Sequence, residues 1–280
     1  MVVVEMISVV IPVIDNHEMT ERCIDYLWYH SSGEVEVIIV DNASEISYVS
    51  GQTLGGSPYT VLRNEENVGV PAAIWQGAEF AHSDVIVFIH NDVYIHEDNW
   101  DVRVRNEFDI KPKLGIAGFF GAPGVTQDGG RYMSMSNMLG LVGGSKGELH
   151  GLIIDGEHPA SVLDGLSMIF RKSVMAELDI SQIPQHHWYD RIIPLEIIAR
   201  GYWCETIGIA FDHDSGRTAG KKQYSDSSKK WLEENNQEVN EDDIDGSTYN
   251  AGYKLFYDNW AQHLPLFVDE NFNYIWRAIF

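Results

Sequence analysis

Three almost wholly apolar runs mark the N-terminal part of the chain. Residues 7–14 (ISVVIPVI), 35–40 (VEVIIV) and 84–89 (DVIVFI) are rich in β-branched side chains and contain few polar positions. Runs of this length without polar alternation are typical of strands that are buried on both faces of a sheet. A shorter run at residues 60–62 predicts a further strand.

Helical patterns lie between these strands. Apolar side chains recur at three- and four-residue spacing over residues 18–31, and residues 70–82 carry a second helical pattern. Strands and helices that alternate in this way predict a parallel sheet covered by helices on both faces. Such sheets bind ligands at the carboxyl ends of their strands, so the residues that follow each strand are the first candidates for a site.

Polar residues gather at these strand ends. Asp15 follows the first strand, Asp41 and Asn42 follow the second, and Asp92 follows the third long run. Because the carboxyl ends of parallel strands meet at one edge of a sheet, these residues predict a functional site there, without indicating its chemistry.

The pattern changes after residue 110. Glycine-rich segments cover residues 115–124 and 140–151, and an extended run covers residues 161–174. Helical spacing returns near residues 175–180 and 189–200.

The C-terminal part is first polar and then aromatic. Residues 213–250 include an acidic run at 233–245, which we interpret as a solvated helix and loop. The end of the chain (YKLFYDNWAQHLPLFVDENFNYIW) is too aromatic for a disordered tail, so we expect it to pack on the body of the protein. We therefore predict one domain over residues 1–231, with halves of about 1–110 and 111–231, and a C-terminal extension over 232–280.

The composition narrows the class of protein. A chain of 280 residues with 44% hydrophobic content can bury the core of one large α/β domain. Its formal net charge of −23 repels a phosphate backbone and argues against a nucleic-acid partner.

The cysteines and the apolar N-terminus do not indicate a disulfide, a zinc site or a targeting segment. Cys23 and Cys204 lie among apolar residues without a CxxC spacing, which argues against a disulfide framework or a zinc site. The apolar N-terminus contains Glu5 and no preceding Lys or Arg, unlike a signal peptide. No apolar run approaches the length of a membrane span, so we expect a cytoplasmic protein.

Two N-terminal segments carry a resemblance to a known family. ISVVIPVIDN (7–16) is followed, after one helix, by VIIVDNAS (37–44). The pair resembles family 2 glycosyltransferases, especially the rhamnosyltransferase-like branch, whose GT-A fold is a Rossmann-like α/β/α sandwich with a mixed central sheet. The resemblance implies that Asp41 holds the base or ribose of a nucleotide and that Pro12 and Val13 line its pocket. An Asp-Asn pair after a strand is also ordinary turn chemistry.

The segment RNEENVGVPAAIWQGAEFA (63–81) is similar to the family's Asn-x-x-Asn-x-Gly stretch, which leads into a helix beside the nucleotide. The resemblance implies that Asn64 and Asn67 fix this donor-binding loop and that Gly69 allows a close backbone turn. The amino end of the following helix favours a nearby anion. An ordinary helix cap explains this stretch equally well when it is taken alone.

The segment DVIVFIHNDVYI (84–95) is similar to the family strand that ends in an acidic metal motif. The resemblance implies that Asn91 and Asp92 face the donor and that Asp92 binds Mn²⁺ or Mg²⁺ at the diphosphate, because hard cations favour carboxylate oxygen. His90 stands where the strict motif has its first Asp, which leaves the metal stoichiometry open. The alternative is that Asp92 only caps a turn.

Two later segments extend the resemblance. VLDGLSMIFRKSV (162–174) matches a family segment that lies under the donor sugar and acceptor, which implies contacts from Asp164 and Gly165. HHWYDRIIPLEIIARGYWCETIGIAFDHDSG (186–216) matches the segment that supplies a general base, here Asp190. The same segment ends in His213, which the resemblance makes a second ligand of the metal ion.

Neighbouring residues compete for these roles. His186 and His187 are rivals for acceptor or metal binding, and Glu196 is a weaker rival for the base. Four residues stand out in so acidic a chain, and we expect them to close over the diphosphate as a lid: Lys221, Lys222, Tyr224 and Lys230.

The resemblance implies a hexosyl- or deoxyhexosyltransferase. Its donor would be a UDP-, GDP- or dTDP-sugar, and its acceptor a free hydroxyl, with a glycan expected and a modified DNA base left open. Transfer would be a single metal-assisted displacement with inversion at the anomeric carbon.

Two alternatives come from other classes. A catalytically inactive relative that only binds nucleotide sugars would explain the imperfect motif at His90. A nucleotidyltransferase would require a glycine-rich basic loop after the first strand, and IPVIDNHEMT contains neither Gly nor Lys.

Overall fold

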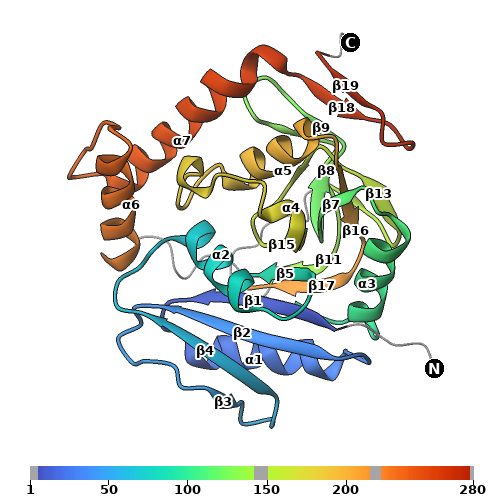
Figure 1. The fold of residues 1–280 in the computed structure, drawn as a ribbon, viewed down its shortest axis with the longest axis vertical. Coiled ribbons are helices and arrows are strands. Elements are labelled where there is room, and N and C mark those ends of the chain that lie inside the picture. The colour runs from blue at the N-terminus through green and yellow to red at the C-terminus, as the bar shows by residue number, and fades with distance from the viewer. Residues whose placement is uncertain (1–5, 142–150, 215–221, 278–280) are drawn as a thin grey trace.

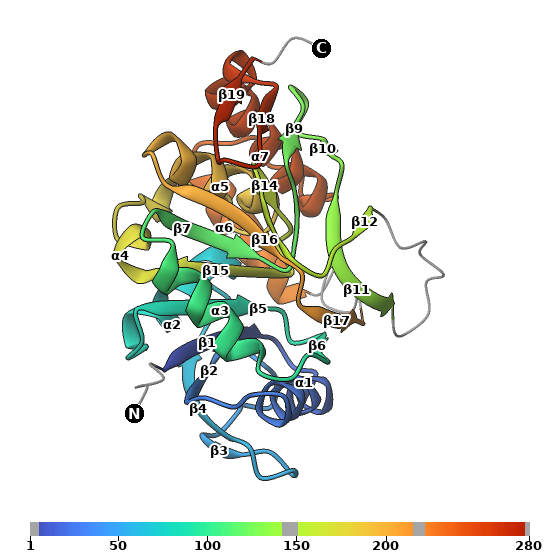
Figure 2. The ribbon, with the colours of Figure 1, turned by 90° about the vertical axis from the view of Figure 1, so that its right-hand side faces the viewer.

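A nine-stranded mixed sheet runs through the centre of the molecule (Figures 1 and 2). A computed structural model describes residues 6–141, 151–214 and 222–277 of the chain. The strand order is β13-β16-β7-β15-β5-β1-β2-β4-β3. The strands of this sheet are β1 (Ile7–Val13), β2 (Val35–Asn42), β3 (Gly51–Gln52), β4 (Pro58–Asn64), β5 (Val85–Ile89), β7 (Leu114–Gly118), β13 (Glu157–Pro159), β15 (Ser167–Arg171) and β16 (Trp203–Ile207).

The three long apolar runs form neighbouring parallel strands. β1 lies between β2 and β5, and Val13 at the end of β1 is in register with Asp41 at the end of β2. Every residue of β5 is buried, as a strand covered on both faces requires. β15 runs antiparallel between β5 and β7, and this makes the sheet mixed.

Helices cover both faces of the sheet, as the alternating pattern predicts (Figure 2). One face shares a core with α2, α4 and α5, and the other face shares a second core with α1 and α3. These helices are α1 (His17–Tyr29), α2 (Val70–Phe80), α3 (Trp100–Ile110), α4 (Lys172–Met175) and α5 (Tyr189–Ala199). None of the helices within the described ranges is long and apolar enough to cross a membrane.

Two smaller sheets complete the fold. A six-stranded sheet has the order β14-β8-β11-β17-β6, with β12 paired to β11, and a four-stranded sheet has the order β10-β9-β18-β19. The strands of the first are β6 (Val93–Ile95), β8 (Phe120–Ala122), β11 (Met135–Leu141), β12 (Leu152–Ile153), β14 (Val162–Leu163) and β17 (Ala210–His213). The strands of the second are β9 (Gly124–Val125), β10 (Arg131–Tyr132), β18 (Leu266–Val268) and β19 (Tyr274–Trp276).

The middle of the chain differs from the pattern-based prediction. The extended run 161–174 is divided into β14 and β15 around Asp164, and its last residues form α4. The helix predicted near 175–180 is wrong, because α4 ends at Met175 and only a 3₁₀ turn (Ile180–Gln182) follows. Some glycine-rich residues of this region lie in strands, such as Gly118 at the end of β7. Glycine is needed there because a Cβ would lie only 2.8 Å from the Ser167 carbonyl oxygen.

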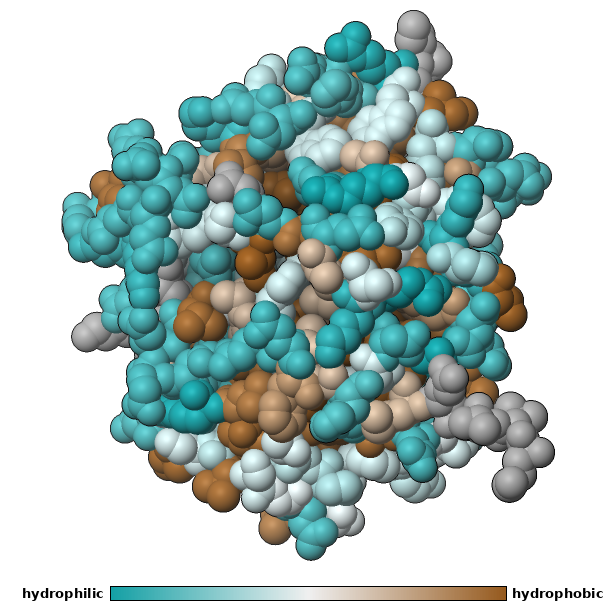
Figure 3. Space-filling model, in the orientation of Figure 1, coloured by the Kyte–Doolittle hydropathy of each residue, from teal (hydrophilic) through white to brown (hydrophobic). Residues whose placement is uncertain are grey.

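The C-terminal segment packs on the body of the protein. Phe256 and Trp260 of α7 (Ile244–Trp260) belong to the same core as α5. The chain then passes through a 3₁₀ turn (Ala261–His263) to β18, which pairs with β9. The surface over α6 (Lys222–Glu234) and the connection to α7 is mainly hydrophilic (Figure 3), as expected for a solvated helix and loop.

Candidate functional site

A carboxylate and two imidazoles meet where β5 and β17 end. His90 and Asp92 follow β5, and pairing of β17 with β6 places His213 opposite Val93. Asp92 Oδ1 lies 3.4 Å from His213 Nε2 and 3.8 Å from His90 Nδ1. One ligand atom from each of the three residues lies within 4.8 Å of the others, which a single divalent cation can bridge after small side-chain adjustments.

The charge state of this group suits a cation. Burial would raise the pKa of Asp92, but the imidazoles of His213 and His90 lower it. Burial would lower the pKa of His213, but Asp92 raises it. Asp92 Oδ1 is buried and has no hydrogen-bond partner of normal geometry among the described residues. Because an ionised oxygen is costly to bury without a partner, the donor set fits a metal ion.

Asp41 lies at the end of β2 with a fully buried side chain. Its Oδ1 accepts a hydrogen bond from Ser44 N (2.9 Å), and its Oδ2 accepts from Tyr48 N (3.0 Å) and Arg63 Nη1 (2.6 Å). Burial would raise the pKa of Asp41, but the hydrogen bonds from Ser44, Tyr48 and Arg63 lower it. The carboxylate therefore shapes the loop after β2, and its contact with a nucleotide stays a prediction.

Pro12, Val13 and Asn91 lie at the same edge of the sheet. Pro12 is half-buried and Val13 is buried at the end of β1. Asn91 Nδ2 donates to Thr20 Oγ1 over 2.9 Å, so the Asn91 amide is turned toward α1. Donor contacts from these three residues also stay predictions.

The loop before α2 is held by its own amides. Asn64 and Gln76 exchange hydrogen bonds of 2.9 and 3.0 Å, and Asn67 Oδ1 accepts from Gly69 N over 2.8 Å. Gly69 has a φ of +87°, and a Cβ there would lie 2.0 Å from Gln185 Oε1. Glycine is therefore needed at this position both for its backbone conformation and for the close approach of the loop before α5.

A second charged group surrounds the start of α5. Arg131 Nη2 lies 2.7 Å from Asp190 Oδ2 and 2.8 Å from Asp164 Oδ2, and Arg191 also pairs with Asp190 Oδ2. Asp164 Oδ1 accepts from Leu166 N over 3.0 Å. Burial would raise the pKa of Asp164, but Arg131 lowers it. Within the described chain, Asp190 Oδ1 is left without a hydrogen bond, whereas both Asp164 oxygens are engaged.

One cavity of about 420 Å³ connects the two groups, because His90, Asp164 and Asp190 all line it. Gly165 lines it as well, and a Cβ there would lie 2.4 Å from the Tyr189 hydroxyl. The remaining lining residues come from the β9–β10 turn, the loop before α5 and α7; they are Asp128, Gly129, Gly130, His186, His187, Trp188, Tyr189, Arg191 and Tyr249. The volume and the mixture of aromatic and charged side chains are typical of a small-molecule site.

The rival residues have other partners or lie elsewhere. Burial, with a smaller effect from His187, lowers the pKa of His186 to about 3, so this imidazole is neutral. His187 Nε2 lies 2.9 Å from Asp245 Oδ1, at the start of α7. Glu196 pairs with Arg200 along α5 and does not line the cavity.

Some residues of these groups were not assigned from the sequence. His90 was treated as a departure from a motif, although imidazole is itself a metal ligand and this was an available signal. Arg131 lies 59 residues before Asp190 on a two-residue strand, so no local pattern pointed to it. Of the residues expected to form a lid, Lys221, Lys222 and Tyr224 have side chains outside the described part of the structure. The fourth, Lys230, places its Nζ 2.5 Å from Glu66 Oε1.

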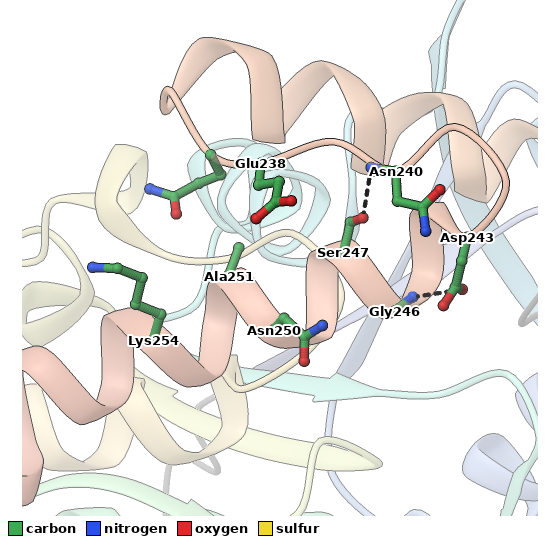
Figure 4. Close-up of a pocket in the computed structure, with 9 residues that line it drawn as sticks. Glu238, Asn240, Asp243, Gly246, Ser247, Asn250, Ala251 and Lys254 are labelled. Atoms are coloured by element: carbon green, nitrogen blue, oxygen red, sulfur yellow. Dashed lines mark hydrogen bonds between the residues drawn. The ribbon is translucent and has the colours of Figure 1, made fainter.

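A further cavity of about 260 Å³ lies between α7 and the connection from α6 (Figure 4). Two backbone amides on its wall are already bound: Asn240 N donates to Ser247 Oγ over 2.9 Å, and Gly246 N donates to Asp243 Oδ1 over 3.0 Å. The second bond caps the start of α7, and the first ties the preceding connection to the helix, so both have a structural explanation.

Comparison with known proteins identifies the family of this chain and supports its fold class. Residues 8–176, more than half of the chain, match the family model described as Glycosyl transferase family 2. No curated protein matches the chain in sequence. Of the residues discussed above, Asp92 and Asp164 lie inside the matched range, whereas Asp190 and His213 lie beyond it.

Two solved structures are similar. One is the mannosyltransferase PcManGT from Pyrobaculum calidifontis in complex with GDP-Man and Mn²⁺, with 12% identity and a TM-score of 0.50 over 91% of this chain and 70% of that chain. The other is S. aureus TarS 1–349, with 13% identity and a TM-score of 0.49 over 92% and 73%. The first likeness, together with the large mixed sheet, confirms the predicted fold class of GT-A type.

Proposed function

The chain belongs to glycosyl transferase family 2, and we propose that it moves a sugar from a nucleoside-diphosphate donor to an acceptor hydroxyl in one inverting displacement. The observation that carries this proposal is a single cavity lined by both Asp190 and His90. His90 belongs to the group of possible metal ligands with Asp92 and His213. A base for the acceptor and a place for the leaving group are the two elements that such a reaction needs.

Asp190 is the proposed general base. Its Oδ2 is paired with Arg131 and Arg191, which hold the carboxylate in one orientation, while Oδ1 has no hydrogen bond among the described residues and is the proposed proton acceptor. Asp164 lines the same cavity, but both of its oxygens are engaged, by Arg131 and by Leu166 N. We therefore assign Asp164 to positioning rather than to proton transfer.

His90, Asp92 and His213 would hold a divalent cation, Mn²⁺ or Mg²⁺. When bound, such a cation neutralises the charge of a diphosphate leaving group. The support from this chain is the orphaned oxygen of Asp92 and the two neighbouring imidazoles. Two nitrogens and one oxygen suit Mn²⁺ better than Mg²⁺, which favours an all-oxygen shell.

The proposed reaction balances without any covalent enzyme intermediate. The acceptor oxygen forms a bond to the anomeric carbon as Asp190 Oδ1 takes the hydroxyl proton. The bond between that carbon and the diphosphate oxygen breaks, and the nucleoside diphosphate leaves with the electron pair. Attack from the face opposite the leaving group inverts the anomeric centre.

The donor side is proposed to lie along the carboxyl ends of β1, β2 and β5. Asp41 is the proposed contact for the base or ribose, with Pro12 and Val13 as walls of the pocket. The similar PcManGT structure holds GDP-Man and Mn²⁺, so a GDP-sugar is one donor to test beside UDP- and dTDP-sugars. A hexosyl or deoxyhexosyl group is the proposed cargo.

A donor screen tests the proposal. We expect one nucleotide sugar, with Mn²⁺, to raise the melting temperature of the protein, because a ligand that binds only the native state stabilises it. The same donor should release its nucleoside diphosphate slowly to water and faster with an acceptor. Binding of a donor without any release would favour the inactive relative, and no thermal shift with any donor would contradict both readings.

A further inference from the structure

The cavity beside Asp190 has a wall that the family match does not reach. Tyr249 of α7 lines the cavity, yet 49% of its surface is exposed. The family match covers residues 8–176, so α7 (Ile244–Trp260) lies outside it. A large aromatic ring is normally buried when a neighbour can cover it, whereas Tyr249 is half-exposed and is part of the cavity lining.

Several contacts fix the position of this ring. Its centroid lies 5.4 Å from that of Trp188 and 5.6 Å from that of His187, on the loop before α5. His187 Nε2 pairs with Asp245 Oδ1 over 2.9 Å, which ties the same loop to the first turn of α7. Asp243 caps that turn through Gly246 N (Figure 4). The ring is therefore held in place before any ligand arrives, which reduces the entropy cost of binding.

Trp188 is the centre of this wall. It has a φ of +69°, which is uncommon for a bulky residue and is typical of constrained sites. Its indole packs between two glycines, since a Cβ on Gly129 or Gly252 would lie 2.4 or 2.8 Å from it. Trp188 is only 8% exposed, and its Nε1 has no hydrogen-bond partner within the described ranges.

A second buried donor in the same loop lacks a partner. The guanidinium of Arg191 pairs with Asp190 through Nη1, but its Nε is buried and unpaired among the residues that the structure describes. A buried donor without a partner costs free energy, and the hydroxyl oxygens of a ligand in the cavity would supply acceptors.

The aromatic wall and the carboxylates of the cavity together favour one class of ligand. An exposed aromatic face suits the apolar face of a pyranose ring, and the carboxylates Asp164 and Asp190 suit its hydroxyl groups. Asp164 and Asp190 are paired with Arg131 and Arg191. These charges are therefore largely compensated, which suits a neutral ligand rich in hydroxyl groups, whereas a purely apolar ligand would leave the polar groups of the cavity without partners.

We infer that Tyr249 is an acceptor-binding residue and that the acceptor is an uncharged carbohydrate whose ring stacks on it. This inference rests on the proposed function for the direction of transfer, but the binding of a sugar at Tyr249 is separate from turnover. The C-terminal segment thereby contributes to the acceptor site of this chain.

Saturation-transfer NMR tests the inference on the full chain. The probes are the methyl glycosides of glucose, galactose, mannose, rhamnose and N-acetylglucosamine. We expect at least one to bind saturably, and Tyr249→Ala to weaken it about tenfold, the effect of losing one stacked face and its burial. Tyr249→Phe should stay within about twofold of the unmodified protein, because the aromatic face remains.

Tyr257 provides a matched control, since it is also 49% exposed on α7 but does not line this cavity. Tyr257→Ala should bind the glycosides as the unmodified protein does. Equal losses in both variants would mean that α7 acts only through stability and would overturn the inference, as would no binding by any probe. Sugar binding that depends on Tyr249, without transfer from any donor, would instead contradict the proposed function alone.

Discussion

The N-terminal half and the rest of the chain assemble their functional side chains in different ways. Asp41 lies at the end of β2 and Asp92 follows β5, and these two strands flank β1 in one sheet. Asp190 is instead held by Arg131 of a short hairpin, and Tyr249 of α7 lines the same cavity; both partners are far away in sequence. The first arrangement follows from strand order alone, whereas the second exists only after hairpin, loop and helix have packed together.

The carboxylates of the two regions also differ in how many of their oxygens accept hydrogen bonds. Asp41 is enclosed by Ser44, Tyr48 and Arg63, with both oxygens engaged. Among the described residues, Asp190 is held through Oδ2 only, and its Oδ1 accepts no hydrogen bond. A fully engaged carboxylate stabilises a loop, and a half-engaged one keeps a lone pair for chemistry. This contrast predicts a much larger kinetic effect at Asp190 than at Asp41.

Asp190→Asn should give the largest effect. Asn keeps the size of the side chain and its position in the first turn of α5, but it cannot accept the acceptor proton. We expect kcat to fall by about 10²–10⁴, the usual contribution of general-base catalysis, with little change in donor affinity. Steady-state kinetics with the best donor measure this effect.

Glu196→Gln is the control for that variant, because Glu196 lies on the same helix and pairs with Arg200 away from the cavity. It should turn over within a few-fold of the unmodified enzyme. If Asp190→Asn did the same, the contrast between the two regions would be lost and Asp164 would become the next candidate.

The metal group should give the next largest effect. Ala at His90, Asp92 or His213 should each raise the Mn²⁺ concentration needed for activity and lower kcat/KM by about 10²-fold. The three effects should be strongly non-additive, because all act through one ion. Activity titrated with Mn²⁺ after EDTA treatment measures them, and full activity in EDTA would show that the leaving group is stabilised without a cation.

Asp41→Asn should have a smaller effect, confined to donor binding. It removes the charge that pairs with Arg63, and it replaces one acceptor oxygen by a donor beside Ser44 and Tyr48. We expect nucleoside-diphosphate affinity to fall by about 5- to 150-fold, corresponding to about 1–3 kcal/mol. Calorimetry measures it, and an unchanged dissociation constant would restrict Asp41 to shaping its loop.

Glu205→Gln should not change kcat, and should change only how the free energy of unfolding depends on pH. Burial in β16, opposed by Lys111, raises the pKa of Glu205 from 4.5 to about 7. The folded protein therefore holds a proton that the unfolded chain releases between these values, so this stabilisation is complete below about pH 4.5 and is lost as pH rises to about 7.

Urea denaturation at pH 5 and pH 8 measures that loss. The unmodified protein should lose about 1–3 kcal/mol of unfolding free energy through this group, and Glu205→Gln should flatten that part of the profile. An identical pH dependence in the variant would mean that Glu205 is ionised throughout, held by Lys111.

Much of the N-terminal half could be predicted from the sequence. The apolar runs at β1, β2 and β5 and the helical spacing of α1 and α2 were correct to within a few residues. Because a strand buried on both faces needs an unbroken apolar run, pattern alone identifies it. The position of Asp41 and Asp92 after such strands places them at one edge, and the family resemblance was confirmed over residues 8–176.

Tertiary structure alone decided the rest. Strands such as β9 and β10 contain two residues each, which is too short for any period to be visible, and they are defined by their pairing with each other and by the pairing of β9 with β18. The pairing of Arg131 with Asp190, the turn of His90 toward Asp92 and the place of Tyr249 in the cavity depend on contacts between distant segments. Local composition determines whether a segment is apolar enough to be buried, but the partner against which it is buried is set by packing of the whole chain.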